Sequence, residues 1–274
     1  MELTKEQLKT YDDLGYLFFP NCFSPEEVKK MKAEVPDIYG KELPGKVLEK
    51  DGKTVRMIHG AHKENEVFRL LSEHSKVVLP IMQILNSSIY VHQFKINAKK
   101  AFDGEIWQWH QDYVYLWEED GLPTPRIANA IIFLDEVNEF NGPLMLIPGS
   151  HKEGVISIIT EAQQDSAYQD SPDWIEAMTT NLKYAINKDT LARLVNQYGS
   201  IVAPKGPAGS VLFFHPNCVH GSASNMSPCD RTIVVINYNS VENLPVAVEN
   251  PRPEFLASRD YRGIEPVSEE ALLL

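Results

Sequence analysis

The second half of the chain is a series of short apolar segments separated by glycine and proline turns, and this pattern constrains the fold more than any other. The turns include Asn141-Gly142 and Pro148-Gly149. Many short strands joined in this way predict a β-sandwich or barrel. We therefore expect a mainly β fold with flanking helices around a jelly-roll core. The predicted strands are Ile89–Asn97, Ala128–Leu134, Pro143–Ile147, Ser210–Phe214 and Thr232–Tyr238.

The first 87 residues predict helices instead. The segment from Thr4 to Gln7 has the spacing of a capping box. The segment from Ser24 to Glu27 is a stronger helix start, with serine as N-cap and proline directly after it. Between these two helices, Gly15–Pro20 predicts a short strand. Val67–Leu85 has apolar residues at helical spacing, in one helix or two.

The chain shows no repeat, low-complexity tract or linker, so we expect one domain over residues 1–274. Helical support should cover about 1–87, and the jelly-roll core about 88–245. A polar, helix-prone stretch at about 155–200 predicts an insertion over one face of the core. This insertion and the loop Tyr113–Pro125 are the expected lids of a site.

The charge of the chain restricts its partners. Lys and Arg number 26 against 38 Asp and Glu, so the formal charge is −12. Such a surplus of acid argues against binding nucleic acid or an anionic membrane. No apolar run approaches the roughly 20 residues that span a bilayer, and we expect no signal peptide. Cys22, Cys218 and Cys229 predict reduced thiols in a cytoplasmic protein. A homodimer is compatible with the sequence.

The sharpest local feature is the pair His110 and Asp112, separated by one residue. On an extended chain these side chains point to the same side and can bind one metal ion. Alone, the pair predicts an exposed hydrogen bond more often than a metal site. His220, about a hundred residues later, completes two histidines and one carboxylate, the donor set of non-haem Fe(II) oxygenases. His215 is the alternative third ligand, and we favour His220 because Gly221 follows it and Arg231 lies at a suitable offset.

Arg231 suggests the cosubstrate. A guanidinium on the strand after the third ligand can hold the far carboxylate of 2-oxoglutarate in a bidentate pair, and the Ser222 hydroxyl can bind the same group. The open positions of the metal would then take the 2-oxo acid and O2. Because halogenases of this chemistry lack the carboxylate ligand, Asp112 predicts hydroxylation, or a related desaturation or cyclisation, and not halogenation.

These residues resemble the phytanoyl-CoA dioxygenase superfamily, Fe(II)/2-oxoglutarate oxygenases with a double-stranded β-helix core. The similarity runs over most of the chain and is closest to the ectoine hydroxylases. It implies that His110, Asp112 and His220 bind iron. It further implies that Arg231 and Ser222, with Asn97 and Trp107, bind 2-oxoglutarate. The resembling segments are Gly15-Tyr16-Leu17, Ser24–Glu27, Val91-His92-Gln93, Glu119-Asp120-Gly121, Asn141–His151, His220-Gly221-Ser222, Asn239–Asn243 and Pro251–Phe255.

The chain departs from the ectoine hydroxylase pattern at the substrate positions. Leu116 stands where that pattern has a tryptophan, with Trp117 displaced by one, and Val235 stands where it has a phenylalanine. Those rings enclose the cationic ring of ectoine, where cation–π contacts are favourable. Lys95 replaces an arginine, whereas Gln93 is retained. A more aliphatic pocket predicts a different small molecule, such as an amino acid or a biosynthetic intermediate, unless Tyr113, Tyr115 or Trp117 replaces the rings in space.

We therefore expect an enzyme that hydroxylates an unactivated C–H of a small molecule and forms succinate and CO2. The alternatives are ectoine 5-hydroxylation itself, desaturation or cyclisation, and a carrier-tethered substrate. A non-enzymatic cupin-like binding module is a further alternative, which Arg231 disfavours because such a module has no need for it.

Overall fold

The computed structural model describes residues 1–156, 172–176, 178–180 and 182–274. The expected insertion at 155–200 therefore lies partly outside the described residues. The strands are β1 (Tyr16–Phe19), β2 (Lys46–Leu48), β3 (Val55–His59), β4 (Ile89–Lys99), β5 (Trp107–His110), β6 (Ile127–Phe133), β7 (Leu144–Leu146), β8 (Val211–Phe214), β9 (His220–Ser222) and β10 (Arg231–Ser240). The helices are α1 (Lys5–Leu14), α2 (Pro25–Gly40), α3 (Ala61–Glu64), α4 (Glu66–Ser72), α5 (Ser75–Leu85), α6 (Asp112–Glu118), α7 (Asp173–Glu176) and α8 (Lys188–Tyr198), with a 3-10 turn at Ser150–Glu153.

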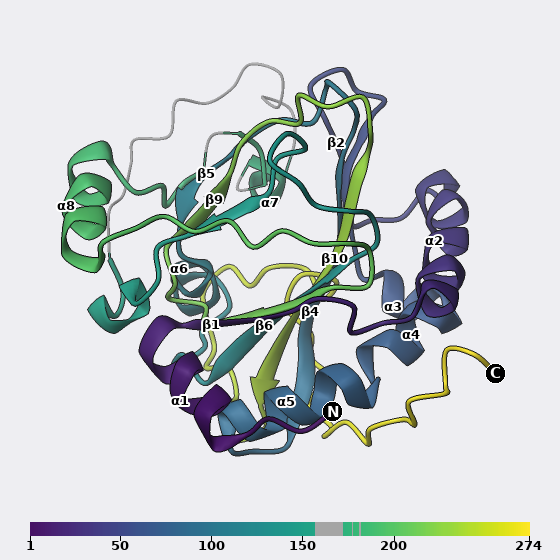
Figure 1. Ribbon diagram of the computed structural model, residues 1–274, viewed down its shortest axis with the longest axis horizontal. Coiled ribbons are helices and arrows are strands. Elements are labelled where there is room, and N and C mark those ends of the chain that lie inside the picture. The colour runs from purple at the N-terminus through teal and green to yellow at the C-terminus, as the bar shows by residue number, and fades with distance from the viewer. Residues whose placement is uncertain (157–171, 177, 181) are drawn as a thin grey trace.

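Two antiparallel sheets form the core, as the turn pattern predicts. The seven-stranded sheet has the order β1-β8-β6-β10-β4-β3-β2, and the three-stranded sheet has the order β5-β9-β7. In Figure 1, α5 lies at the bottom, β5 and β9 lie at the top, and β4, β6 and β10 run between them. Strands β2 and β3 were not predicted from the sequence; they extend the large sheet beyond β4. The jelly-roll expectation is confirmed.

The two capping boxes form as predicted. Thr4 accepts a hydrogen bond from the Gln7 backbone, and the Gln7 side chain bonds back to the cap. Ser24 and Glu27 make the same reciprocal pair at the start of α2. These bonds fix where α1 and α2 begin, because they satisfy backbone N–H groups that a helix leaves free.

The alternation of side chains along β10 separates two cores. Val234, Ile236 and Tyr238 face the helices and belong to the larger apolar cluster. Ile233 and Val235 face the small sheet. Every residue of β10 is buried, so both faces of this strand are covered. No helix in the described part of the chain is long and apolar enough to cross a membrane.

One expected lid is not a loop. Residues Asp112–Glu118 form helix α6, and Tyr113 through Leu116 are buried in it. Tyr113 donates its hydroxyl to the Leu122 carbonyl at 3.0 Å, which ties the helix to the turn that follows. This segment is therefore a helix packed into the fold and not the loop that was expected to act as a lid.

Buried histidines predict a stability that depends on pH. The His62 ring stacks on Phe94 with ring centroids 4.9 Å apart, and burial lowers the pKa of His62 to about 4. A His whose folded pKa lies below its usual 6.5 favours the neutral form. Its contribution to stability is therefore complete above pH 6.5 and is lost as the pH falls toward 4. His62→Phe keeps the stacked ring and removes this titration, so its urea midpoint should fall less between about pH 7.5 and about pH 5. Measured on metal-free proteins, equal pH dependence would contradict the prediction.

Candidate metal centre and its cavity

The inner face of the large sheet presents a polar row to one cavity. Gln93, Lys95 and Asn97 alternate along β4, and each lies opposite a residue of β10 that also lines the cavity. These pairs are Gln93 with Asn237, Lys95 with Val235 and Asn97 with Ile233. The two-residue period thus places polar and apolar groups side by side in one cavity.

Three side chains meet on the opposite wall. His110 ends β5, His220 begins β9, and these two residues pair directly across the small sheet. Asp112 begins α6, two residues after His110. Its Oδ1 lies 3.7 Å from Nε2 of His110 and 3.8 Å from Nε2 of His220. The potential ligand atoms all lie within 4.8 Å of one another, so one metal ion could contact all three.

Backbone carbonyls orient both imidazole rings. Nδ1 of His110 lies 2.7 Å from the Gln108 carbonyl, and Nδ1 of His220 lies 3.0 Å from the Cys218 carbonyl. A carbonyl only accepts, so each Nδ1 carries the proton and each Nε2 offers its lone pair to the centre.

The protonation states suit a divalent metal. Burial alone would raise the pKa of Asp112, but His220, Lys95 and His110 together hold it well below its ordinary value. Burial and His110 lower the pKa of His220 to about 4. A neutral His220 imidazole and an ionised Asp112 carboxylate are therefore present at neutral pH. This donor set fits Fe(II) and leaves three coordination positions for other ligands.

Arg231 lies at the start of β10 and is almost fully buried. Its Nη2 donates to the Gly142 carbonyl at 2.8 Å, and its Nε has no partner. Within the described part of the chain, no carboxylate lies within ion-pair distance of Arg231. Burial lowers its pKa to about 10, which leaves it charged at neutral pH. Ser222, Asn97 and Trp107 line the same cavity.

Not all of the residues expected to contact the substrate line the cavity. Gln93, Lys95, Leu116 and Val235 line the cavity. Trp117 does not: its side chain is 43% exposed on the outer side of α6. Tyr115, on the inner side of that helix, lines the cavity, and its ring lies edge-on to His110 at 6.4 Å between centroids.

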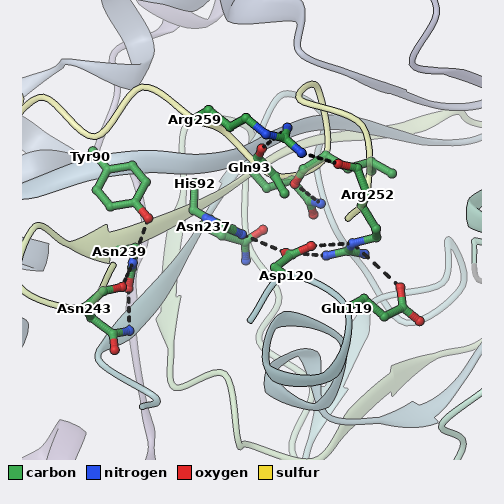
Figure 2. Close-up of polar contacts among 12 residues, drawn as sticks. Tyr90, His92, Gln93, Glu119, Asp120, Asn237, Asn239, Asn243, Arg252 and Arg259 are labelled. Carbon is green, nitrogen blue, oxygen red and sulfur yellow. Dashed lines mark hydrogen bonds and ion pairs between the residues drawn. The ribbon is translucent and has the colours of Figure 1, made fainter. Parts of the chain in front are cut away.

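Arg252 also lines the cavity, although no role is predicted for it from the sequence. Figure 2 shows it paired with Asp120, whose two oxygens accept from Nε at 2.7 Å and from Nη2 at 2.6 Å. Asp120 also contacts Nε2 of His92 at 2.8 Å, and Glu119 lies 3.7 Å from the guanidinium. Arg252 therefore has its charge balanced by acids outside the cavity. A role for Arg252 could have been inferred from its position in Pro251–Phe255, one of the segments that resemble the ectoine hydroxylases.

The other histidines lie away from this centre. The His215 ring lies tilted against His151 and Tyr11 beside α1, with ring centroids 5.1 Å and 6.5 Å away. Its Nδ1 accepts from the Asn217 backbone. His59 is buried, with its Nε2 3.0 Å from the Met57 sulfur. Of the alternatives for the third position, only His220 belongs to the group that could hold a metal.

Comparisons with known proteins agree with this geometry. The family model for phytanoyl-CoA dioxygenase (PhyH) matches residues 11–233. The L-proline trans-4-hydroxylase of Streptomyces griseoviridis is 35% identical over 258 residues, 94% of each chain. The ectoine dioxygenase of Bordetella bronchiseptica is 35% identical over 275 residues, 97% of this chain and 86% of that protein.

Solved structures point the same way. The crystal structure of EctD from S. alaskensis with 2-oxoglutarate and 5-hydroxyectoine has a TM-score of 0.81 and 29% identity, and the match covers 97% of this chain and 88% of that one. A structure of EctD from S. alaskensis with bound Fe has a TM-score of 0.79 and 27% identity, over 97% of this chain and 88% of that one. This chain therefore belongs to the phytanoyl-CoA dioxygenase (PhyH) family and is a non-haem Fe(II)- and 2-oxoglutarate-dependent dioxygenase that hydroxylates a small molecule.

Proposed function

We propose that this enzyme hydroxylates a free amino acid with an aliphatic ring, such as proline. The observation that carries the proposal is Lys95, a half-buried residue whose ammonium lines the cavity and has no hydrogen-bond or ion-pair partner among the described residues. Burial lowers its pKa, and Arg252 lowers it further, while Asp112 acts in the opposite direction. A substrate carboxylate would supply the missing counter-charge.

Arg252 is the weaker candidate for that carboxylate. Two of its nitrogens already donate to Asp120 at charge-assisted distances, and Glu119 lies nearby. Because its charge is balanced, it attracts a further anion less than Lys95 does. We propose that Arg252 shapes the cavity wall and that Lys95 binds the carboxylate.

The apolar wall beside Lys95 suits an aliphatic ring. Leu116, Val235 and Ile131 are each at most 4% exposed and line the cavity together. Methylene groups packed against these side chains are removed from water, which stabilises the complex by about 0.8 kcal/mol per CH₂. Gln93, whose Nε2 donates to the Leu256 carbonyl at 2.9 Å, is a further substrate contact in this proposal. The relative named L-proline trans-4-hydroxylase supports the proposed substrate class.

The roles of the remaining cavity residues follow. We propose that His110, Asp112 and His220 bind iron and that Arg231 binds the far carboxylate of 2-oxoglutarate. Ser222 and Asn97 would complete that subsite, with the Ser222 hydroxyl and the Asn97 NH₂ group as the donors to the cosubstrate. The Trp107 ring is held by the Arg56 guanidinium, 4.1 Å from its centroid, and forms the side of the subsite. Iron and 2-oxoglutarate, when bound, supply the oxidising chemistry; the residues hold the C–H in place and exclude water.

Ectoine is the second candidate substrate. Tyr115 lines the cavity beside Leu116 and presents an aromatic ring near the position that the sequence pattern leaves without one. The likeness to EctD supports this alternative. Replacement of two rings by Leu116 and Val235 favours the amino acid.

We also propose that residues 1–274 act as one domain and that the enzyme is cytoplasmic. Cys22, Cys218 and Cys229 are all free thiols, which suits a reducing compartment. That the enzyme forms a homodimer remains a prediction from the sequence.

The substrate proposal is tested by succinate formation with Fe(II), 2-oxoglutarate and a panel of proline, pipecolic acid, acyclic amino acids and ectoine. We expect turnover above the substrate-free background for the cyclic amino acids and little for ectoine. Turnover that is greatest with ectoine would contradict the proposal, and mass spectrometry of the product identifies the hydroxylated compound.

Lys95→Met should raise the KM for the amino acid by about 100-fold or more, because a buried charge-assisted contact contributes about 3 kcal/mol. Lys95→Arg should retain part of the affinity, since it keeps the charge. The KM for 2-oxoglutarate should stay within about threefold of the wild-type value. An amino-acid KM that Lys95→Met leaves unchanged would place the substrate carboxylate elsewhere.

Arg231→Met should change the KM for 2-oxoglutarate and not the KM for the amino acid. It removes the guanidinium next to Gly142, so the KM for 2-oxoglutarate should rise by about 100-fold or more, with little change in the KM for the amino acid. Arg231→Lys keeps a positive charge but cannot make the bidentate contact. Its KM for 2-oxoglutarate should therefore lie between the values for the wild type and Arg231→Met. If both variants bind 2-oxoglutarate as the wild type does, another residue holds the cosubstrate.

A further inference from the structure

The two carboxylate oxygens of Asp112 have different surroundings. Oδ1 faces Nε2 of His110 and of His220. Oδ2 accepts a hydrogen bond from Nδ2 of Asn129 at 2.7 Å. One oxygen is therefore directed toward the metal centre, and the other is held by a neutral side chain on β6.

Asn129 is itself held by a second asparagine. Its Oδ1 accepts from Nδ2 of Asn237, which lies directly opposite on β10. Asn129 is 0% exposed and Asn237 is 1% exposed, so water does not compete for these bonds. Three polar side chains thus form a row from β10 through β6 to Asp112.

The chemistry of the row fixes the direction of both amides. An ionised carboxylate can only accept, so Asn129 must turn its NH₂ group toward Asp112. Its carbonyl then faces Asn237, which must turn its own NH₂ group toward Asn129. The carbonyl oxygen of Asn237 is left buried without a partner.

The unpartnered side-chain carbonyl of Asn237 makes this pair of asparagines less favourable for stability than an apolar pair would be. The neighbouring positions Val235 and Ile131 are apolar and pack in the same layer. Aliphatic residues at 129 and 237 would avoid burying an unsatisfied acceptor, which is unfavourable. The polar row ends at the Asp112 carboxylate, and an apolar pair at positions 129 and 237 could not donate a hydrogen bond that orients it.

We propose that Asn129, oriented by Asn237, is a positioning residue that holds Asp112 as a one-oxygen metal ligand. While Oδ2 is bound to Asn129, only Oδ1 is free to reach the metal. A carboxylate that bound through both oxygens would take a coordination position that the cosubstrate needs. The inference rests on the proposed assignment of Asp112 as a ligand, and it extends the metal site to Asn129 and to Asn237, which also lines the cavity.

The test measures binding of Co(II) to metal-free protein by calorimetry, independently of turnover. Asn129→Leu should raise the Co(II) Kd by about 10–100-fold, the usual effect of losing a hydrogen bond that orients a ligand. Asn237→Leu leaves the Asn129 donor in place but frees it to rotate, so its Kd should rise by a smaller factor. The visible Co(II) spectrum of both variants should change, because it reports the coordination of the metal.

The matched control is Asn239→Ala. Asn239 is a buried asparagine two residues further along β10, and its amide bonds Tyr90 and Asn243 and not the metal-site row. This variant should lower the Tm and leave the Co(II) Kd and spectrum unchanged. Asn237→Leu should keep its Tm within a few degrees of the wild type, so that weaker metal binding there is not a folding defect.

The outcomes distinguish the ligand role of Asp112 from the positioning role of Asn129 and Asn237. If the wild type and Asp112→Ala bind Co(II) equally, the ligand assignment fails and the positioning role fails with it. If Asp112→Ala loses binding while folded Asn129→Leu and Asn237→Leu keep the wild-type Kd and spectrum, the positioning role alone is overturned. Weakened binding in both asparagine variants, with the control unchanged, supports it.

Discussion

The pairing of β10 between β4 and β6 is the constraint on which the rest of this structure depends. Ten consecutive residues of β10 are buried, so its two-residue period assigns every side chain either to the helical core or to the cavity. One face carries Val234, Ile236 and Tyr238 into the core. The other carries Arg231 and Asn237 toward the cavity. A shift of register by one residue would exchange these sets and bury charge in the apolar core.

The sequence predicted the parts of the fold that have strong local signals. Both capping boxes, the jelly-roll strands and the meeting of His110, Asp112 and His220 follow from residue type and spacing. Strands β2 and β3 escaped prediction because they are three and five residues long and are stabilised by pairing of β3 with β4 and of β2 with β3. Such pairing leaves little trace in local sequence.

The composition of the cavity wall was harder to predict, since it depends on which face of an element points inward. Trp117 and Tyr115 are two residues apart, yet the former is exposed and the latter lines the cavity, because α6 begins at Asp112 and turns them to different sides. Arg252 is far along the chain, and only the fold shows that it reaches the cavity and pairs with Asp120. Asn129 lies inside an otherwise apolar strand, where a single polar residue gives no spacing pattern to recognise.

The pair of Arg252 with Asp120 has a consequence for how such enzymes diverge. The metal-site residues and Arg231 stand on β5, α6, β9 and β10, whereas Arg252 and Leu256 belong to a segment that follows the last strand of the core. Changes in this late segment can therefore remodel the space offered to a substrate without disturbing the reacting centre. Because His110, Asp112 and His220 lie on other elements, substitutions in this segment can change the substrate while the oxidation chemistry stays intact.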